Sequence, residues 1–374
     1  MTSAMTGPPF ILITAGGTGG HVFPAEALAA VLEARGCRLG FMTDDRGAGH
    51  GGALGRLQTW RLSAGGIAGL SARSRVRGVF RLARGAFQAW RLMGKLKPDA
   101  VVGFGGYAAV PGVAAALWRG RPILIHEQNG VLGRANRLFA GRVDAIATAL
   151  PQTRHLPEGK GRHVGNPVRP ATLAVRDVPY AAPTGDGPIR LLVTGGSQGA
   201  RALTDLVPAA LAGLPDDLRA RLRVAQQCRP EDLERARGIY ADAGIEAETA
   251  AFFDDIPARL ASAHLVICRA GASTVAELTC AGRPAVLIPY PHATDDHQTA
   301  NARALEDVGA GWLEPQAELT AGALSVRLAG LLAEPGTLAA TAARAHALGR
   351  PDAAERLADL ALSVATHGKE RAAA

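Results

Sequence analysis

Two glycine-rich turns in the sequence could hold phosphate groups. The first turn, residues 16–20, follows an apolar run over residues 10–14, and the second, residues 195–199, follows residues 189–193. Each turn leads into a helical pattern, so unpaired backbone N–H groups would point outward beside the positive end of a helix dipole. The chain is therefore expected to be an α/β protein with two doubly wound, Rossmann-like domains that face each other across a phosphate-binding cleft.

Further polar residues follow other predicted strands of the first half. Gly105 and Gly106 come after a strand at residues 99–103 and could hold a second phosphate in the same domain. The strand at residues 122–125 ends in His126, Glu127, Gln128 and Asn129. Parallel sheets bind their ligands at the carboxyl ends of strands. Singly, each of these residues is explained by a turn or a helix cap, but the cluster favours a site.

The second half has a comparable small-residue turn at residues 269–277. Glu277 lies one turn into the following helix, where it could reach ribose hydroxyls, while the N–H groups of Ser273 and Thr274 face phosphate. An N-cap followed by a first-turn glutamate is the alternative, and propensity alone favours it. A polar loop at residues 290–301 again follows a predicted strand and enters a helix.

Composition limits the class of protein and its partners. The 374 residues suit two domains, and the formal net charge of +8 requires an anionic partner such as nucleic acid, an anionic membrane or a phosphorylated substrate. The four cysteines are scattered, which suggests neither a zinc site nor disulfides and fits a reduced, cytosolic compartment. The N-terminus lacks the basic and apolar segments of a signal peptide. The uncharged residues 100–118 are broken by glycine and proline, which favours a strand, a turn and a short helix over a membrane span.

The most basic part of the chain is a predicted helix within residues 71–97. Its basic residues fall on one side with aromatic residues beside them, and Trp118 of the next helix could extend this face. The members are Arg77, Phe80, Arg81, Arg84, Phe87, Trp90, Arg91 and Trp118. One interpretation is a solvated cationic face beside an ordinary core stripe; the other is a patch that binds anionic lipid headgroups. No motif of a nucleic-acid-binding module is visible.

Periodicity predicts the other elements and the domain limits. Strands are expected at residues 38–43, 59–62, 222–226, 248–251, 265–268 and 285–288, and a loop at 43–57. Residues 164–188 read as a connection, and residues 338–362 as two helices. The expected domains are residues 1–165 and 166–349, with a C-terminal helix at about 350–366 that packs back on the first.

Several motif alternatives are disfavoured. Val22 breaks a GxGxxG pattern, so a nucleotide-sugar is a better ligand than a dinucleotide cofactor. Gly195, Ser197 and Gly199 spell the nucleophile elbow of α/β hydrolases, but that fold has a single sheet. The chain has no Asp-x-Asp, so neither a metal nor another cofactor is expected, and helix N-termini and arginine would meet the charge of a leaving diphosphate.

The ordered set of motifs resembles the MurG family of peptidoglycan N-acetylglucosaminyltransferases, which have the two-domain GT-B fold. The motifs are GGTGGHVFPA from Gly16, FGGYAAVPG from Phe104, HEQNGVLGRAN from His126, VGNPVR from Val164, GGSQGA from Gly195, FFDD from Phe252 and CRAGASTVAE from Cys268. The resemblance extends from Phe10 to about Leu362.

The resemblance implies an activity and a set of donor contacts. The family moves GlcNAc from UDP-GlcNAc to the C4 hydroxyl of MurNAc in lipid I, giving lipid II at the cytoplasmic face of the inner membrane, where such an enzyme is peripheral. The implied UDP-GlcNAc contacts are Thr18, Gly19, Gly20, Asn129, Arg169, Ser197, Phe253, Ala272, Ser273, Thr274, Val275, Ala276, Glu277 and Gln298. The acceptor diphosphate is expected at Gly16, Gly17, Gly105, Gly106 and Tyr107. Cell-wall synthesis or division proteins are possible partners, and nucleic acid is not expected.

A transfer that inverts the anomeric carbon is one in-line displacement, so a single base must take the proton of the acceptor hydroxyl as UDP leaves. His21 is the first candidate, because the helix dipole should keep its imidazole neutral; capping or diphosphate binding is the alternative, and Glu127 is the rival base. Two other classes of function stay open. One is a related GT-B enzyme with another lipid acceptor or a UDP-GlcNAc epimerase, and the other is a non-catalytic, basic membrane adaptor.

Overall fold

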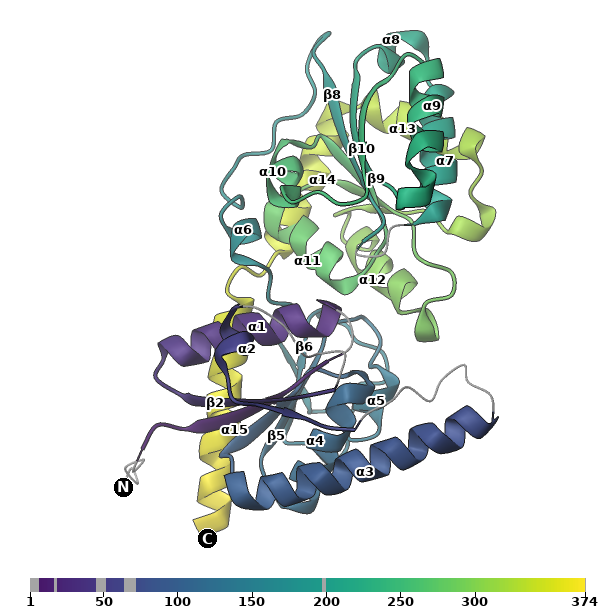
Figure 1. Cartoon of the computed structure of the whole chain (residues 1–374). Coiled ribbons are helices and arrows are strands. Elements are labelled where there is room, and N and C mark those ends of the chain that lie inside the picture. Colours follow the sequence, from purple (N-terminus) through teal and green to yellow (C-terminus); the bar gives the residue numbers. More distant parts are fainter. Residues whose placement is uncertain (1–6, 17–18, 45–51, 64–71, 197–199, 374) are drawn as a thin grey trace. The chain divides into compact units, whose positions relative to one another are not determined.

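The computed structural model describes residues 7–16, 19–44, 52–63, 72–196 and 200–373. The chain forms two compact units (Figure 1). Unit 1 is Met1–Val168 together with Pro351–Ala374, and unit 2 is Arg169–Arg350. Residues 166–168 thus belong to unit 1, beyond the boundary at residue 165 expected from the sequence.

Unit 1 is built on a parallel sheet in the order β3-β2-β1-β4-β5-β6-β7. The strands are β1 (Phe10–Thr14), β2 (Arg38–Thr43), β3 (Thr59–Arg61), β4 (Ala100–Gly103), β5 (Ile123–Glu127), β6 (Ala145–Thr148) and β7 (Gly161–His163). The predicted bounds of β1 and β2 are confirmed. The central strands are buried on both faces, which explains their continuous apolar runs.

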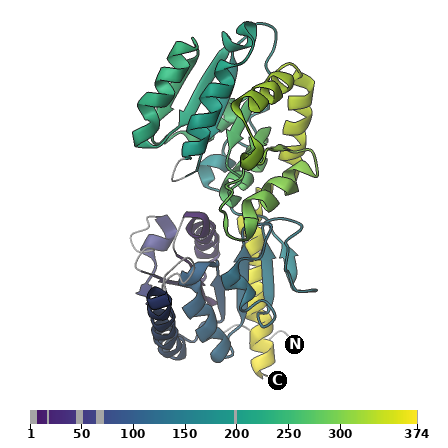
Figure 2. The ribbon, with the colours of Figure 1, turned by 90° about the vertical axis from the view of Figure 1, so that its right-hand side faces the viewer.

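Helices cover both faces of this sheet. Ile11 and Ile13 of β1 pack in one core with α1 (Gly19–Ala34) and α15 (Ala353–Ala373). Leu12 packs in the other core with α3 (Ala72–Leu96) and α4 (Gly106–Trp118), because alternate residues of a strand point to opposite faces. The helices of unit 1 are α1 (Gly19–Ala34), α2 (Gly52–Arg56), α3 (Ala72–Leu96), α4 (Gly106–Trp118), α5 (Arg134–Arg137) and α15 (Ala353–Ala373). Figures 1 and 2 show α3 and α4 together on one face.

The C-terminal helix α15 belongs to unit 1 although the chain reaches it from unit 2. Leu357, Ala358 and Ala361 are buried in the core that α1 shares. At the surface, Asp359 pairs with Arg35 of α1 at 2.6 Å, and Arg371 pairs with Asp144. The chain therefore leaves unit 1 after Val168 and returns to it at Pro351.

The loop predicted over residues 43–57 is wrong in its last part, where α2 forms. The carboxylate of Glu26 in α1 accepts hydrogen bonds from the backbone N–H groups of Ala53 and Leu54, the latter at 3.0 Å. Ala53 and Leu54 are buried. A helix of five residues is too short to show a period in the sequence, and this one is capped by a residue distant in the chain.

Unit 2 has a parallel sheet in the order β10-β9-β8-β11-β12-β13. The strands are β8 (Ile189–Thr194), β9 (Leu222–Gln227), β10 (Glu246–Ala250), β11 (Leu265–Cys268), β12 (Ala285–Leu287) and β13 (Trp312–Leu313). The helices are α6 (Pro170–Leu173), α7 (Arg201–Ala212), α8 (Asp216–Arg219), α9 (Leu233–Asp242), α10 (Ile256–Ser262), α11 (Ala272–Ala281), α12 (His297–Glu306), α13 (Ala321–Leu332) and α14 (Pro335–Leu348). The predicted bounds of β11 are confirmed, and residues 189, 191 and 193 of β8 pack against α7 and α13.

The strand order reverses once in each sheet. In unit 1 the chain builds outward from β1 in one direction and from β4 in the other, and in unit 2 the same reversal lies between β8 and β11. Open parallel sheets bind ligands beyond the carboxyl ends of their strands at this switch point. The turns after β1, β4, β8 and β11 are therefore the places where ligands are expected to bind.

Candidate active site

The two described glycine turns of unit 1 meet at its switch point. Gly16, after β1, is buried, and a Cβ there would lie 2.7 Å from Cβ of Ala108 in α4, so only glycine fits this approach. Gly105 and Gly106, after β4, have φ values of +80° and +67°. Gly17 and Thr18 lie outside the described residues, and Gly19 and Gly20 begin α1.

His21 lies in the first turn of α1 beside the second of these turns. A Cβ built on Gly106 would lie 3.3 Å from its Nε2. The other ring nitrogen, Nδ1, is 2.9 Å from Oε1 of Gln128, which follows β5. Tyr107 is half-buried at the start of α4. The structure thus brings His21 and the Gly105–Gly106 turn together from opposite sides of the switch point.

His126, near the end of β5, is fully buried. Its Nε2 is 3.0 Å from the carbonyl oxygen of Gly165, and its ring packs edge-on against Phe104. Burial lowers the pKa of His126 to about 4, the bond to Gly165 opposes that shift, and the charge of His21 adds to it. The ring is therefore neutral near pH 7.

The carboxylate of Glu127 orders the loop that follows β5. It accepts hydrogen bonds from the backbone N–H groups of Asn129 and Gly133 at 3.1 and 2.8 Å and from the side-chain amides of Asn129 and Asn136 at 3.2 and 2.8 Å. Glu127 is 2% exposed. The prediction that β5 ends at Ile125 is wrong, because His126 and Glu127 are its last two residues. Both oxygens of Glu127 already have donors, which fits a structural role better than proton transfer.

In unit 2, the turn after β8 is organised by Thr194. Its hydroxyl donates to Oε1 of Gln227 at 2.9 Å and accepts from the N–H of Gly196 at 3.3 Å. Gly195 and Gly196 are half-buried, and Ser197 lies outside the described residues.

The donor contacts implied for residues 272–277 form the first turns of α11. The N-cap residue of this helix is Gly271, which has no side chain to bond the first N–H groups. The turn before the helix is stabilised by Asn301 of α12, whose Nδ2 donates to the carbonyl of Ala270 at 2.9 Å. Ala272, Ser273, Thr274 and Ala276 are half-buried and Val275 is buried. First-turn N–H groups in this setting suit a phosphate.

Glu277 pairs with Arg169, the first residue of unit 2. Nε and Nη2 of Arg169 lie 3.1 and 2.9 Å from Oε1 of Glu277. Burial raises the pKa of Glu277, and Arg169 opposes that shift. Two predicted donor contacts are thus adjacent in the folded unit.

Phe253 and Gln298 complete the donor residues. Phe253 is buried, with the guanidinium of Arg259 3.9 Å above its ring. Oε1 of Gln298 accepts from the N–H of Tyr290 at 2.9 Å, which fixes the start of the loop after β12. Arg269 lies 5.7 Å from the Tyr290 ring and donates to the carbonyls of Ile288 and Pro289. Sequence reasoning did not assign a site role to Arg269, Asn301 or Gln227, because their partners lie in other strands and turns.

Two of the three aromatic residues of α3 lie outside the core. Phe80 and Phe87 are 70% and 57% exposed, and Trp118 of α4 is 66% exposed, whereas Trp90 packs against the core that contains Ala89 and Met93 of α3. Arg81, Arg84 and Arg91 are exposed beside them. Trp90 is half-buried, with the guanidinium of Arg119 3.8 Å over its ring. The side chain of Arg77 lies outside the described residues. Among the described helices, none has both the length and the apolar character needed to cross a membrane.

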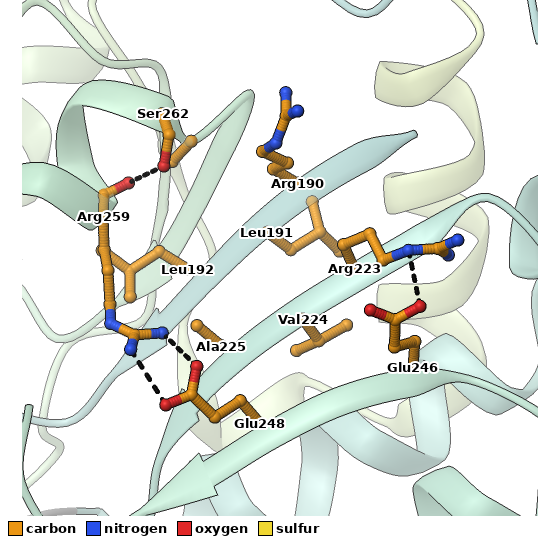
Figure 3. Close-up of a pocket in the computed structure, with 11 residues that line it drawn as sticks. Arg190, Leu191, Leu192, Arg223, Val224, Ala225, Glu246, Glu248, Arg259 and Ser262 are labelled. Carbon is orange, nitrogen blue, oxygen red and sulfur yellow. Dashed lines mark hydrogen bonds and ion pairs between the residues drawn. The ribbon is translucent and has the colours of Figure 1, made fainter. Parts of the chain in front are cut away.

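A cavity of about 210 Å³ in unit 2 has Arg259, which stacks over Phe253, among its lining residues (Figure 3). It is lined by the first halves of β8, β9 and β10 and by α10, at the end of the sheet opposite to the glycine turns. Two of its arginines form ion pairs, since Arg223 contacts Glu246 at 2.8 Å and Arg259 contacts Glu248 at 2.7 Å. It is not part of the candidate site.

Two Rossmann-like units with glycine turns at their switch points have the architecture of the GT-B fold, and the matches to two domains of one family make the protein a glycosyltransferase of that fold. Residues 11–148 match the glycosyltransferase family 28 N-terminal domain, and residues 190–357 match its C-terminal domain. The chain belongs to the MurG family within this group, and the resemblance indicated by its ordered motifs is confirmed.

The similarity to individual members covers nearly the whole chain. A protein of Paramagnetospirillum magneticum is 58% identical over 96% of this chain and 98% of its own length. One from Rhodospirillum rubrum is 55% identical over 96% and 93%. Both are named UDP-N-acetylglucosamine--N-acetylmuramyl-(pentapeptide) pyrophosphoryl-undecaprenol N-acetylglucosamine transferase. The crystal structure of MurG from Acinetobacter baumannii aligns with a TM-score of 0.79 at 33% identity, covering 95% of this chain and all of that one.

Proposed function

We propose that this protein transfers GlcNAc from UDP-GlcNAc to the C4 hydroxyl of MurNAc in lipid I, giving lipid II for peptidoglycan synthesis. The main support is the 58% identity to a relative of that name over 96% of the chain, together with the family 28 domains. The same similarity disfavours the alternatives of another lipid acceptor, a UDP-GlcNAc epimerase and a non-catalytic adaptor.

We place the donor on unit 2. The carboxylate of Glu277, held by Arg169, would accept hydrogen bonds from the ribose hydroxyls. The N–H groups of the turn after β8 and of the first turn of α11 would stabilise the diphosphate. Negative charge grows on that diphosphate as the sugar leaves, and fixed N–H dipoles stabilise it most in the transition state.

We assign the base to His21 of unit 1. An inverting transfer is a single displacement, in which the acceptor hydroxyl loses its proton as it attacks the anomeric carbon. His21 is half-buried beside the glycine turns that would hold the acceptor diphosphate. Glu127 is occupied by four donors, and we assign it to ordering the loop that carries Asn129.

We further propose that the protein is peripheral at the cytoplasmic face of the membrane and docks through α3. The exposed Phe80 and Phe87 would enter the headgroup region, and the neighbouring arginines would bind anionic lipid. Contacts with cell-wall synthesis or division proteins stay a prediction.

The function is tested with purified protein, UDP-GlcNAc and a soluble lipid I analogue. We expect a disaccharide product and free UDP that appear together. Binding of UDP without transfer to this acceptor would contradict the proposed acceptor, and failure to bind UDP in calorimetry would contradict the donor site as well.

A further inference from the structure

The side-chain amide of Gln128 is buried and can take only one orientation. Its Nε2 lies 3.1 Å from the carbonyl oxygen of Phe104 and 3.1 Å from that of His126. Carbonyl oxygens only accept hydrogen bonds, so the atom that faces both must be the NH₂ group. A flipped amide would place three acceptor oxygens together in a buried site. The amide oxygen must therefore point the other way, toward His21.

This orientation fixes the proton on His21. Nδ1 of His21 lies 2.9 Å from Oε1 of Gln128. Because an amide oxygen only accepts, Nδ1 has to carry the hydrogen of this bond. A neutral imidazole has one N–H, so Nε2 of His21 then carries the lone pair. Glycine at position 106 places no side chain against that nitrogen, whereas a Cβ there would lie only 3.3 Å from it and crowd it.

His126 contacts the NH₂ group of Gln128, whose amide oxygen contacts His21. Its Nε2 lies 3.0 Å from the carbonyl of Gly165 and must donate to it. Its Nδ1 therefore carries the lone pair, 3.0 Å from Nε2 of Gln128, and shares the two hydrogens of that NH₂ group with the carbonyls of Phe104 and His126. A proton on that Nδ1 would point at the NH₂ group of Gln128, so that two hydrogen-bond donors would face each other. The neutral state of His126 therefore supports the same amide orientation.

We propose that Gln128 is a positioning residue that holds His21 as the Nδ1–H tautomer, so that Nε2 is the atom that takes the acceptor proton. The inference rests on the proposed role of His21 as the base. As the acceptor oxygen bonds to the anomeric carbon, its proton moves to Nε2, and the electron pair of the breaking bond leaves on the diphosphate of UDP. The imidazolium keeps its Nδ1–H bond to Gln128 until Nε2 returns the proton to water.

The first test reads the tautomer in the unmodified protein. Protein labelled with ¹⁵N-histidine is measured by long-range ¹H–¹⁵N correlation at a pH where His21 is neutral, and the His21 signals are assigned by their loss in His21→Ala. We expect a protonated Nδ1 and an unprotonated Nε2. The reverse tautomer in the folded wild-type protein would overturn the proposal, and this readout needs no variant of Gln128 and no enzymatic activity.

The second test removes the amide. Gln128→Met should lower kcat by about tenfold or more with the KM for UDP-GlcNAc within about twofold of wild type, and it should shift His21 toward the Nε2–H tautomer. Gln88→Met is the matched control, since Gln88 is a glutamine of the same unit whose amide oxygen accepts from the N–H of Ser63. A folded Gln128→Met protein with wild-type kcat and an unchanged tautomer would overturn the proposal. Failure of the proposed function itself is recognised separately, as absence of transfer by the wild-type protein.

Discussion

Arg169 and Glu277 lie 108 positions apart in sequence, yet two guanidinium nitrogens of Arg169 contact a single carboxylate oxygen of Glu277. The Glu277 side chain is 15% exposed. The other carboxylate oxygen is thereby left for a further partner, and ribose hydroxyls would suit it. The pair is the most specific feature of the proposed donor site.

Removing the charge of Glu277 should weaken donor binding. We expect Glu277→Gln to raise the KM for UDP-GlcNAc by about tenfold or more, which is about 1.4 kcal/mol, because a neutral amide accepts more weakly from hydroxyls and no longer holds Arg169. Steady-state kinetics with varied donor measures this. Glu246→Gln is the matched control, since it removes an ion pair with Arg223 in the same unit at the opposite end of the sheet. Equal KM values for the two variants would argue against the donor role.

Donor binding should also depend on pH through the same carboxyl group. Burial holds the pKa of Glu277 above the ordinary value of 4.5. As the pH falls through that raised pKa, the carboxylate is protonated and the ion pair with Arg169 is lost. Calorimetric titration with UDP-GlcNAc should therefore show weakening affinity at a pH still above 4.5. In Glu277→Gln this component should be missing, and an unchanged pH dependence would assign it to another group.

His126 should make unit 1 less stable in mild acid. Its pKa is about 4 in the folded protein and 6.5 when unfolded, so the unfolded chain binds the proton first as the pH falls. At about 1.4 kcal/mol per pKa unit, about 3 kcal/mol of stability is lost between pH 6.5 and 4. Urea unfolding followed by tryptophan fluorescence reports mainly on unit 1, which holds Trp60, Trp90 and Trp118.

The variant His126→Gln should flatten this pH dependence. His264→Gln is the control, because burial also lowers the pKa of His264 but that residue lies in unit 2. If both variants and the wild type lose stability in parallel, His126 is not the responsible group.

Neutralising the exposed arginines of α3 should release the protein from anionic membranes. Each basic residue at such a surface contributes about 1 kcal/mol, so Arg81→Gln, Arg84→Gln and Arg91→Gln combined should weaken binding by about 100-fold. Co-sedimentation with vesicles containing phosphatidylglycerol measures it. A protein with Arg237→Gln, Arg303→Gln and Arg356→Gln has the same net charge and should bind like wild type. Binding that is equal for neutral and anionic vesicles and insensitive to salt would contradict electrostatic docking.

The sequence predicts those elements whose own residues carry a clear pattern of apolar side chains. Buried strands such as β1 and β11 are unbroken apolar runs, and their bounds were predicted correctly. By contrast, β7 and β13 have only three and two residues, and α2 depends on a cap from Glu26, so neither periodicity nor composition marks them.

The site was predictable as a set of turns but not as a set of contacts. The glycines of residues 16–20 and 105–106 are visible in the sequence itself, where they predict turns that could bind phosphate. The bonds of His126 to Gly165 and of Arg169 to Glu277 join residues 39 and 108 positions apart, and only the folded sheet determines which side chains meet. The exposure of Phe80 and Phe87 likewise depended on which side of α3 packs on the sheet.

The role of His21 as the base is tested most directly by the rate of lipid II formation by His21→Ala at saturating UDP-GlcNAc and lipid I analogue. We predict that kcat falls by about 100-fold or more while the affinity for UDP stays within about twofold of wild type. A loss of less than about tenfold, which is under about 1.4 kcal/mol of transition-state stabilisation, would contradict general-base catalysis by His21.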